Sequence, residues 1–150
     1  MALEDLYRDV ILDHYRNPRH RQSLENPDAT GEGVNPLCGD EITVELRLDG
    51  DRVTDISVHG QGCSISQSSA SMMSDAVMGK TRPEIDRLAE RFNRMMTAED
   101  DDAAGLDPSR PGAVLGDLEA LQGVRRYPVR IKCASLPWTT LAQALSNGAG

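Results

Sequence analysis

Two neighbouring stretches of the chain alternate between apolar and polar residues, and this alternation restricts the fold more than any other feature. Ile42, Val44, Leu46 and Leu48 occupy every second position of the first stretch, and residues 53–58 form a second stretch in which Ile56 and Val58 keep this spacing. A period of two places the apolar side chains on one face of a β-strand. The segment LDGDR between the stretches contains an Asp-Gly pair, which favours a tight hairpin turn. The sequence therefore predicts a β-hairpin that buries one face.

Apolar residues at helical spacing occur on both sides of this hairpin. The predicted helices cover residues 2–16, 65–78, 82–96, 114–122 and 128–145. Ser64 is expected to cap the second helix, and Thr81 with Glu84 matches a capping box at the start of the third. Pro137 inside the last helix predicts a kink or a break. This order of elements indicates the α+β class, with helices covering one face of a small antiparallel sheet.

Two segments of the chain lack periodicity. Residues 18–37 are rich in Pro, Gly and Asn, and we expect an ordered but irregular loop there. Residues 97–112 are acidic and contain several Pro and Gly, which is typical of an exposed, flexible segment. Because 150 residues are a natural size for one compact unit, we expect residues 1–150 to form a single domain with a flexible acidic insertion.

The charge and hydropathy of the chain exclude several classes of function. The formal net charge is −8 and no basic stripe could neutralise phosphates, so we expect no nucleic-acid partner. No window approaches the roughly 20 apolar residues of a membrane helix. The start MALEDLYRDV lacks the basic and apolar regions of a signal peptide. We therefore expect a cytoplasmic protein with no membrane association, whose cysteines stay reduced.

Three cysteines, Cys38, Cys63 and Cys133, lie in three different structural contexts. They are far apart and form no CxxC pair, so their spacing is a weak sign of a metal site, and three separate buried cysteines fit equally well. Gly39, however, lets the backbone turn Cys38 and Asp40 toward one point. Cys63 and Cys133 also fall near predicted helix N-termini, where the partial positive charge stabilises a thiolate. If the sulfurs converge, Asp40 completes a set of three sulfurs and one oxygen suited to tetrahedral zinc.

Other polar side chains near the cysteines each allow two interpretations. Arg130 precedes Cys133 by about one helical turn, so it could stabilise a thiolate or persulfide, or it could be an ordinary surface arginine. His14 is expected to pack or cap, and His59 to be a surface residue at a strand end. The serines of SISQSSAS are expected to allow close helix packing, because no His or Lys base is placed to activate one of them.

Four segments of the chain resemble one known family. LYRDVILDHYRNPRH, NPLCGDEITV, GQGCSISQSSASMM and RIKCASLPW are similar to the SufU-type members of the IscU-like (NifU N-terminal) iron–sulfur cluster assembly family. The similarity extends from about residue 3 to about residue 145. The resemblance implies a SufE/IscU-like α+β domain that binds one Zn²⁺ per chain. The matching ligand positions are Cys38, Asp40, Cys63 and Cys133.

The resemblance also implies a sulfur-transfer activity. SufU-type proteins take persulfide sulfur from a SufS-type cysteine desulfurase, whose pyridoxal phosphate belongs to the partner, and they serve downstream iron–sulfur assembly proteins. The acceptor thiol of the family corresponds to Cys38. Asp40 is expected to bind the metal and could also take a proton or tune the charge of the site. Arg130 is the third residue for which we expect a role in the reaction.

Two features separate the sulfurtransferase branch of this family from its cluster-scaffold branch. Lys132 stands where scaffold-type members usually have a histidine, and the connection before Cys133 is longer because it contains residues 97–112. Both features favour the zinc sulfurtransferase. The alternative is an iron–sulfur scaffold that holds a transient nascent cluster on the same cysteines. A third interpretation is an adaptor in which zinc only supports the fold and no sulfur is accepted.

Overall fold

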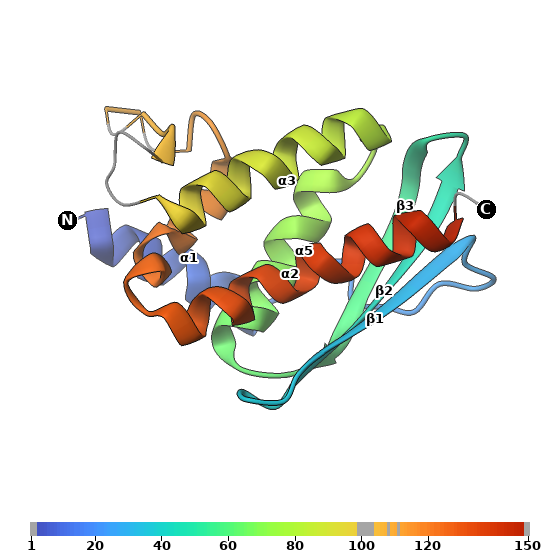
Figure 1. The fold of residues 1–150 in the computed structure, drawn as a ribbon, viewed down its shortest axis with the longest axis horizontal. Helices are drawn as coiled ribbons and strands as arrows, with labels where there is room; N and C mark the ends of the chain where they lie inside the picture. The colour runs from blue at the N-terminus through green and yellow to red at the C-terminus, as the bar shows by residue number, and fades with distance from the viewer. Residues whose placement is uncertain (1–2, 99–103, 108, 111, 149–150) are drawn as a thin grey trace.

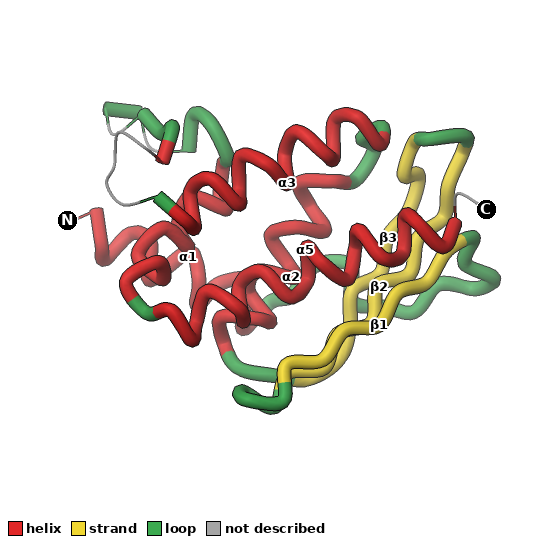
Figure 2. Tube along the Cα trace, viewed as in Figure 1, coloured by secondary structure: helices red, strands yellow, loops and turns green. Residues whose placement is uncertain are grey.

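The helices and strands follow the order that the sequence predicts, with one additional strand. The computed structural model describes residues 3–98, 104–107, 109–110 and 112–148. The elements are α1 (Leu3–Arg16), β1 (Ala29–Asn35), β2 (Asp40–Asp49), β3 (Arg52–Gln61), α2 (Ser64–Val77), α3 (Arg82–Thr97), the 3-10 helix η1 (Gly116–Arg126) and α5 (Pro128–Gly148). The three strands form one antiparallel sheet in the order β1-β2-β3. Helix α5 packs against β1 and β2, and α2 packs against β3 (Figures 1 and 2). The predicted α+β class is confirmed.

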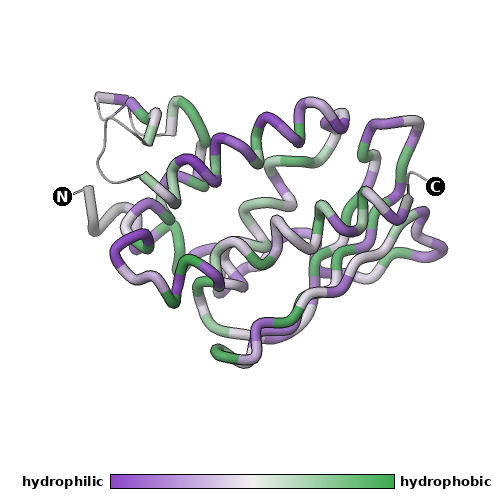
Figure 3. Tube along the Cα trace, in the orientation of Figure 1, coloured by the Kyte–Doolittle hydropathy of each residue, from purple (hydrophilic) through white to green (hydrophobic). Residues whose placement is uncertain are grey.

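The predicted hairpin is formed by β2 and β3. Ile42, Val44 and Leu46 of β2 are buried, as are Ile56 and Val58 of β3. Figure 3 shows apolar and polar residues alternating along these strands. The core beneath the sheet is aliphatic and rich in methionine, which suits a chain with few aromatic residues because methionine fills irregular gaps. Among the described residues, no helix combines the length and the hydropathy needed to cross a lipid bilayer.

Strand β1 corrects the expectation of an irregular loop over residues 18–37. Its sequence, ATGEGVN, has little intrinsic strand propensity. The strand forms because its glycines let α5 approach the backbone directly. A Cβ atom at Gly31 would lie 2.6 Å from the carbonyl oxygen of Thr140 and 2.9 Å from the nitrogen of Ala144. Glycine in this strand therefore marks a close contact with a helix.

Replacing Gly31 by alanine is expected to lower the free energy of unfolding by roughly 1–3 kcal/mol, because the new methyl group collides with the rigid backbone of α5. Gly123→Ala is the matched control, since a Cβ atom there meets nothing within 4 Å. Urea unfolding of both variants measures the difference. Equal stabilities would show that α5 does not pack on β1 at this distance.

Helix α5 runs from Pro128 to Gly148 through Pro137, so the predicted break does not occur. Pro137 removes one backbone donor, but neighbouring side chains hold the helix in place. The Thr140 hydroxyl donates to the carbonyl oxygen of Leu136 at 2.7 Å. The ring of Trp138 stacks on Phe92 of α3, with centroids 5.0 Å apart. Tertiary packing therefore outweighs the local preference of proline.

The helix predicted over residues 114–122 is instead the 3-10 helix η1, which begins at Gly116. Buried Glu119 accounts for this start, because its carboxylate accepts hydrogen bonds from the backbone of Gly112, Val114 and Leu115 at 2.9–3.0 Å. These bonds fix the chain in a turn just before the helix. Within the predicted flexible insertion, residues 99–103, 108 and 111 lie outside the described residues.

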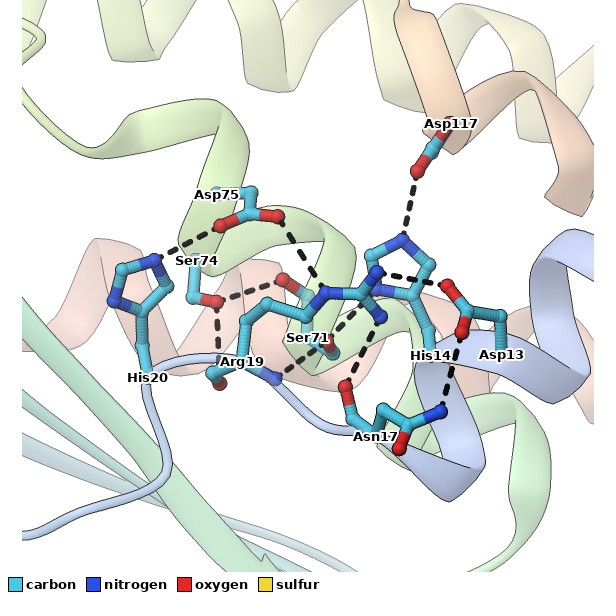
Figure 4. Close-up of polar contacts among 9 residues, drawn as sticks. All are labelled: Asp13, His14, Asn17, Arg19, His20, Ser71, Ser74, Asp75 and Asp117. Carbon is cyan, nitrogen blue, oxygen red and sulfur yellow. Dashed lines mark hydrogen bonds and ion pairs between the residues drawn. The ribbon is translucent and has the colours of Figure 1, made fainter.

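His14 connects three helices, as Figure 4 shows. Its Nδ1 lies 2.8 Å from Oγ of Ser71 in α2, and its Nε2 lies 2.8 Å from Oδ2 of Asp117 in η1. The expectation that no histidine is placed beside a serine is therefore wrong for Ser71. His14 and Ser71 are both buried, however, so no substrate reaches the hydroxyl. The predicted packing role of His14 is confirmed.

Candidate metal centre

The three cysteine segments meet at one end of the sheet (Figure 1). Asn35 at the end of β1 pairs with Asp40 at the start of β2. Glu41 pairs with Gln61, which ends β3 two residues before Cys63. Helix α5 contacts β1, β2 and α2 and contributes Cys133. The topology of the sheet therefore brings together residues that are far apart in the sequence.

A tight turn carries Cys38 at the tip of the β1–β2 hairpin. The backbone N–H of Cys38 donates to the carbonyl oxygen of Asn35 at 3.2 Å. Gly39 has φ +69°, a left-handed conformation that glycine adopts without strain. This turn lets Cys38 and Asp40 face the same point, as the sequence predicts.

Cys38, Asp40 and Cys133 converge. One potential ligand atom from each residue lies within 4.8 Å of the other two. The Sγ atoms of Cys133 and Cys38 are 3.0 Å apart. Asp40 and Cys133 are completely buried, whereas Cys38 is partly exposed. This arrangement contradicts three separate core cysteines and leaves one sulfur accessible at the edge of the group.

Asp40 has two carboxylate oxygens in different situations. Oδ1 accepts hydrogen bonds from the backbone N–H of Cys63 at 2.9 Å and from the hydroxyl of Ser66 at 3.1 Å. Oδ2 is buried and has no hydrogen-bond partner among the described residues. A buried carboxylate oxygen without a donor is costly, so a cation at this position would supply the missing contact.

Cys63 lies next to this group and is not one of its three members. It is the N-cap of α2, which corrects the prediction of Ser64 as the cap. The backbone N–H of Ser66 donates to Cys63 Sγ at 3.5 Å. Cys63 is nevertheless close enough to Cys133 for its charge to act on that thiol. The structure thus unites three of the four predicted ligands and places the fourth beside them.

The environment of Cys133 favours the thiol. Burial raises the pKa of Cys133 well above its usual range, and the neighbouring side chains of Cys38 and Asp40 add to the effect. The expectation that a helix N-terminus stabilises this thiolate is wrong. Helix α5 begins at Pro128, so Cys133 lies beyond the first turn, where the helix dipole acts most strongly. A positive charge is needed to hold the Cys133 sulfur as a thiolate.

Arg130 is brought to the same site. The sulfurs of Cys63 and then of Cys133 raise the pKa of Arg130, because a deprotonated sulfur attracts the guanidinium. The interaction is reciprocal, because the guanidinium stabilises the negative sulfurs. Arg130 is exposed to solvent, which screens this interaction. Arg130 therefore lies close enough to Cys63 and Cys133 for the charges to interact.

Asn35 and Ser66 contact the candidate ligands and are not predicted from the sequence. The Asn35 amide donates to Cys133 Sγ at 3.7 Å. Asn35 lies 98 residues from Cys133 in the sequence, and Ser66 lies 26 residues from Asp40, so no local pattern could reveal either pair. His59 lies outside the group, and its Nε2 is 3.1 Å from Oε1 of Glu45.

Several apolar side chains on the segments that carry Cys38 and Cys133 are exposed. Leu37 beside Cys38 is 73% exposed, and Val34 of β1 is 64% exposed. Tyr127 and Val129 at the start of α5 are also exposed. A hollow of about 670 Å³ lies next to Arg130 and is lined mostly by apolar residues, among them Tyr7, Ile11, Ile65 and Val124. Apolar surface of this kind around a reactive group is typical of an interaction site.

The donor set fits a zinc ion. Thiolate sulfur and carboxylate oxygen are both zinc ligands, and structural and catalytic zinc sites use three or four of them. The buried Oδ2 of Asp40, which has no donor among the described residues, is an oxygen that a cation can contact. Cys38, Asp40 and Cys133, with Cys63 beside them, can therefore hold a metal.

Comparisons with known proteins identify relatives in iron–sulfur cluster assembly. The family described as NifU-like N terminal domain matches residues 6–134. The zinc-dependent sulfurtransferase SufU of Bacillus subtilis (strain 168) is 43% identical over 148 residues, covering 99% of this chain and 95% of that protein. The iron-sulfur cluster assembly scaffold protein IscU of Streptococcus pyogenes serotype M1 is 38% identical over 147 residues, covering 98% and 87%. The crystal structure of FiSufU from Fervidobacterium islandicum AW-1 is 33% identical, with a TM-score of 0.79 over 96% of this chain and 99% of that chain.

Proposed function

This chain belongs to the NifU-like N-terminal domain family, and from this premise we propose that it is a zinc-dependent sulfur acceptor and transferase in iron–sulfur cluster assembly. Its sulfur donor would be a SufS-type cysteine desulfurase in the cytoplasm, and downstream assembly proteins would receive the sulfur. The observation that carries the proposal is the contact between partly exposed Cys38 and buried Cys133, beside the unpaired oxygen of Asp40.

Zn²⁺ would be held by Asp40 and the three cysteines. Cys63 would join the other ligands by giving up its hydrogen bond from Ser66. When bound, zinc keeps its sulfur ligands deprotonated at neutral pH. This matters most for Cys133, because burial raises the pKa of that thiol.

Cys38 would carry the transferred sulfur. Its thiolate attacks the outer sulfur of a cysteine persulfide on the partner. The sulfur–sulfur bond of the donor breaks, the partner's cysteine leaves as a thiolate, and Cys38 becomes the persulfide. Cys38 suits this role because it is more exposed than Cys133 and stands on a glycine turn.

Arg130 would stabilise the negative sulfurs during transfer. We expect Arg130→Gln to slow sulfur transfer roughly tenfold, less than the 10²–10³-fold typical of an enclosed donor, because solvent screens its charge. Rapid-quench measurement of persulfide formation tests this prediction. Arg126→Gln is the control, since Arg126 is an exposed arginine at the end of η1. A rate for Arg130→Gln that equals the control rate would contradict the assignment.

The apolar surface around Cys38 would receive the desulfurase. Leu37, next to Cys38 in the sequence, and Val34 of β1 present exposed apolar area on the hairpin that carries the acceptor sulfur, and Tyr127 presents more of it just before α5. A partner that buries this area would also exclude water from the exchanging sulfurs. Docking of the partner would then also prepare Cys38 for sulfur transfer.

An iron–sulfur scaffold is the second candidate function, because the IscU relatives are named as scaffold proteins and the same cysteines could hold a cluster. The two functions are separable by anaerobic incubation with iron and sulfide. A scaffold gains visible absorption and bound iron, whereas a sulfurtransferase keeps its zinc and stays colourless.

Mapping of the transferred sulfur tests the proposed function. The protein is incubated with a desulfurase and cysteine, alkylated, and cleaved into peptides for mass spectrometry. The proposal predicts a persulfide on the peptide that contains Cys38. Stimulation of the desulfurase with no sulfur on any cysteine would instead identify an adaptor.

A further inference from the structure

Ser66 lies between two of the candidate ligands and is completely buried. It is the third residue of α2, one helical turn from Cys63. Its hydroxyl oxygen is 3.1 Å from Oδ1 of Asp40 and also 3.1 Å from the carbonyl oxygen of Cys63. A serine hydroxyl has a single proton to donate, so these two acceptors compete for it.

Each of the two acceptors already has one backbone donor, since the N–H of Cys63 donates to Oδ1 of Asp40, so the charge of the acceptor settles this competition. The backbone N–H of Gln67 donates to the Cys63 carbonyl at 3.1 Å, as the helix requires. Asp40 is buried and negatively charged, and a hydrogen bond to a charged acceptor is stronger than one to a carbonyl. The proton of Ser66 is therefore directed to Oδ1 of Asp40.

Gly62 restricts the same carboxylate from the opposite direction. A Cβ atom at Gly62 would lie 2.4 Å from Oδ1 of Asp40 and 2.5 Å from Oγ of Ser66. Both oxygens are thus packed directly against the backbone of Gly62. With Oδ1 held by Ser66 and by the N–H of Cys63, the carboxylate has one orientation, in which Oδ2 stays free.

We propose that Ser66 is a positioning residue that acts through Asp40: it turns Oδ1 toward α2 and so presents Oδ2 alone to the metal. This inference rests on the proposed zinc site and extends it to a residue that is not itself a ligand. Asp40 is thereby a one-oxygen ligand with a fixed direction. Without the Ser66 hydroxyl, the carboxylate can rotate and its affinity for the ion falls.

Ser66→Ala tests the inference because it removes the hydroxyl and keeps the backbone N–H that contacts Cys63. Hydrogen-bond partners of metal ligands typically contribute 10–100-fold to affinity, and we expect a loss of roughly that size. Zinc affinity is measured by competition with a chromophoric chelator. Ser68→Ala is the matched control, because Ser68 is an equally buried serine of α2 whose hydroxyl bonds only within the helix, to Ser64 at 2.6 Å and to Ile65 at 3.2 Å.

A double-mutant cycle separates positioning from a general loss of stability. If Ser66 acts through Asp40, Ser66→Ala has no further effect on zinc affinity in an Asp40→Ala background. Thermal unfolding of the zinc-free Ser66→Ala and Ser68→Ala variants checks that both are folded at the temperature of the titration. A Ser66→Ala affinity within threefold of the Ser68→Ala affinity, or an undiminished effect in the Asp40→Ala background, would overturn the inference.

The same titrations distinguish this inference from the proposed function. Wild-type protein that binds no zinc would contradict the zinc site itself. Wild-type protein that binds zinc tightly, together with a Ser66→Ala variant that binds equally well, would contradict only the role of Ser66.

Discussion

Replacing Cys38 by alanine is expected to reduce sulfur acceptance by roughly 10³-fold or more, because the variant has no other exposed thiolate in the group. Cys63 is partly exposed, but it is the N-cap of α2 and lies outside the group, and Cys133 is completely buried. Intact mass after incubation with a desulfurase and cysteine measures the loss. The fold is expected to persist, since Cys38 lies on an exposed turn.

Cys133→Ala is the informative comparison. This change removes a buried sulfur that contacts Asn35 and Cys38, so metal content and stability are expected to fall together. Far-UV circular dichroism and zinc analysis of both variants separate the two roles. Normal sulfur acceptance by Cys38→Ala would show that Cys38 is not the acceptor.

Replacing Gly60 by alanine is expected to destabilise the protein by roughly 3 kcal/mol or more, because steric overlap and backbone strain act together. Gly60 has φ +142°, a conformation that residues with a side chain rarely adopt. A Cβ atom there would lie 2.0 Å from the backbone oxygen of Glu41 on the neighbouring strand. Glu41 follows Asp40, so separating β2 from β3 at this point would also displace a candidate metal ligand.

The effect is measured by chemical unfolding and by zinc content. Gly50→Ala is the control, since Gly50 has φ +63° and a Cβ atom there would meet nothing within 4 Å. Only backbone strain, about 1–2 kcal/mol, is expected there. If Gly60→Ala were no less stable than Gly50→Ala and kept its zinc, the close pairing of β2 and β3 beside the site would be wrong.

The periodic elements of this fold are predictable because each depends on local sequence. The hairpin of β2 and β3 follows from alternation, and Thr81 with Glu84 forms the expected cap, with the Thr81 hydroxyl 2.9 Å from the carboxylate of Glu84. Strand β1 is not predictable in this way. Its glycines lack strand propensity. They are required because α5 packs directly against the backbone of β1, and this contact exists only in the folded protein.

The candidate site is likewise predictable only where it depends on local sequence. Gly39 between Cys38 and Asp40 indicates that the two side chains face the same point, and the structure brings them together with Cys133. The pKa of Cys133 is not predictable, because burial by distant elements outweighs its place in a helix. The partners Asn35 and Ser66 are equally hidden, because each bond joins segments that only the tertiary fold brings together.

The central claim is that zinc at this site enables Cys38 to accept sulfur. The most direct test is the zinc content of the purified chain, combined with its intact mass after incubation with a desulfurase and cysteine, before and after zinc removal. We predict one zinc per chain and a mass gain of one sulfur atom that disappears when zinc is removed. Bound iron with a visible chromophore and no sulfur on Cys38 would contradict the account.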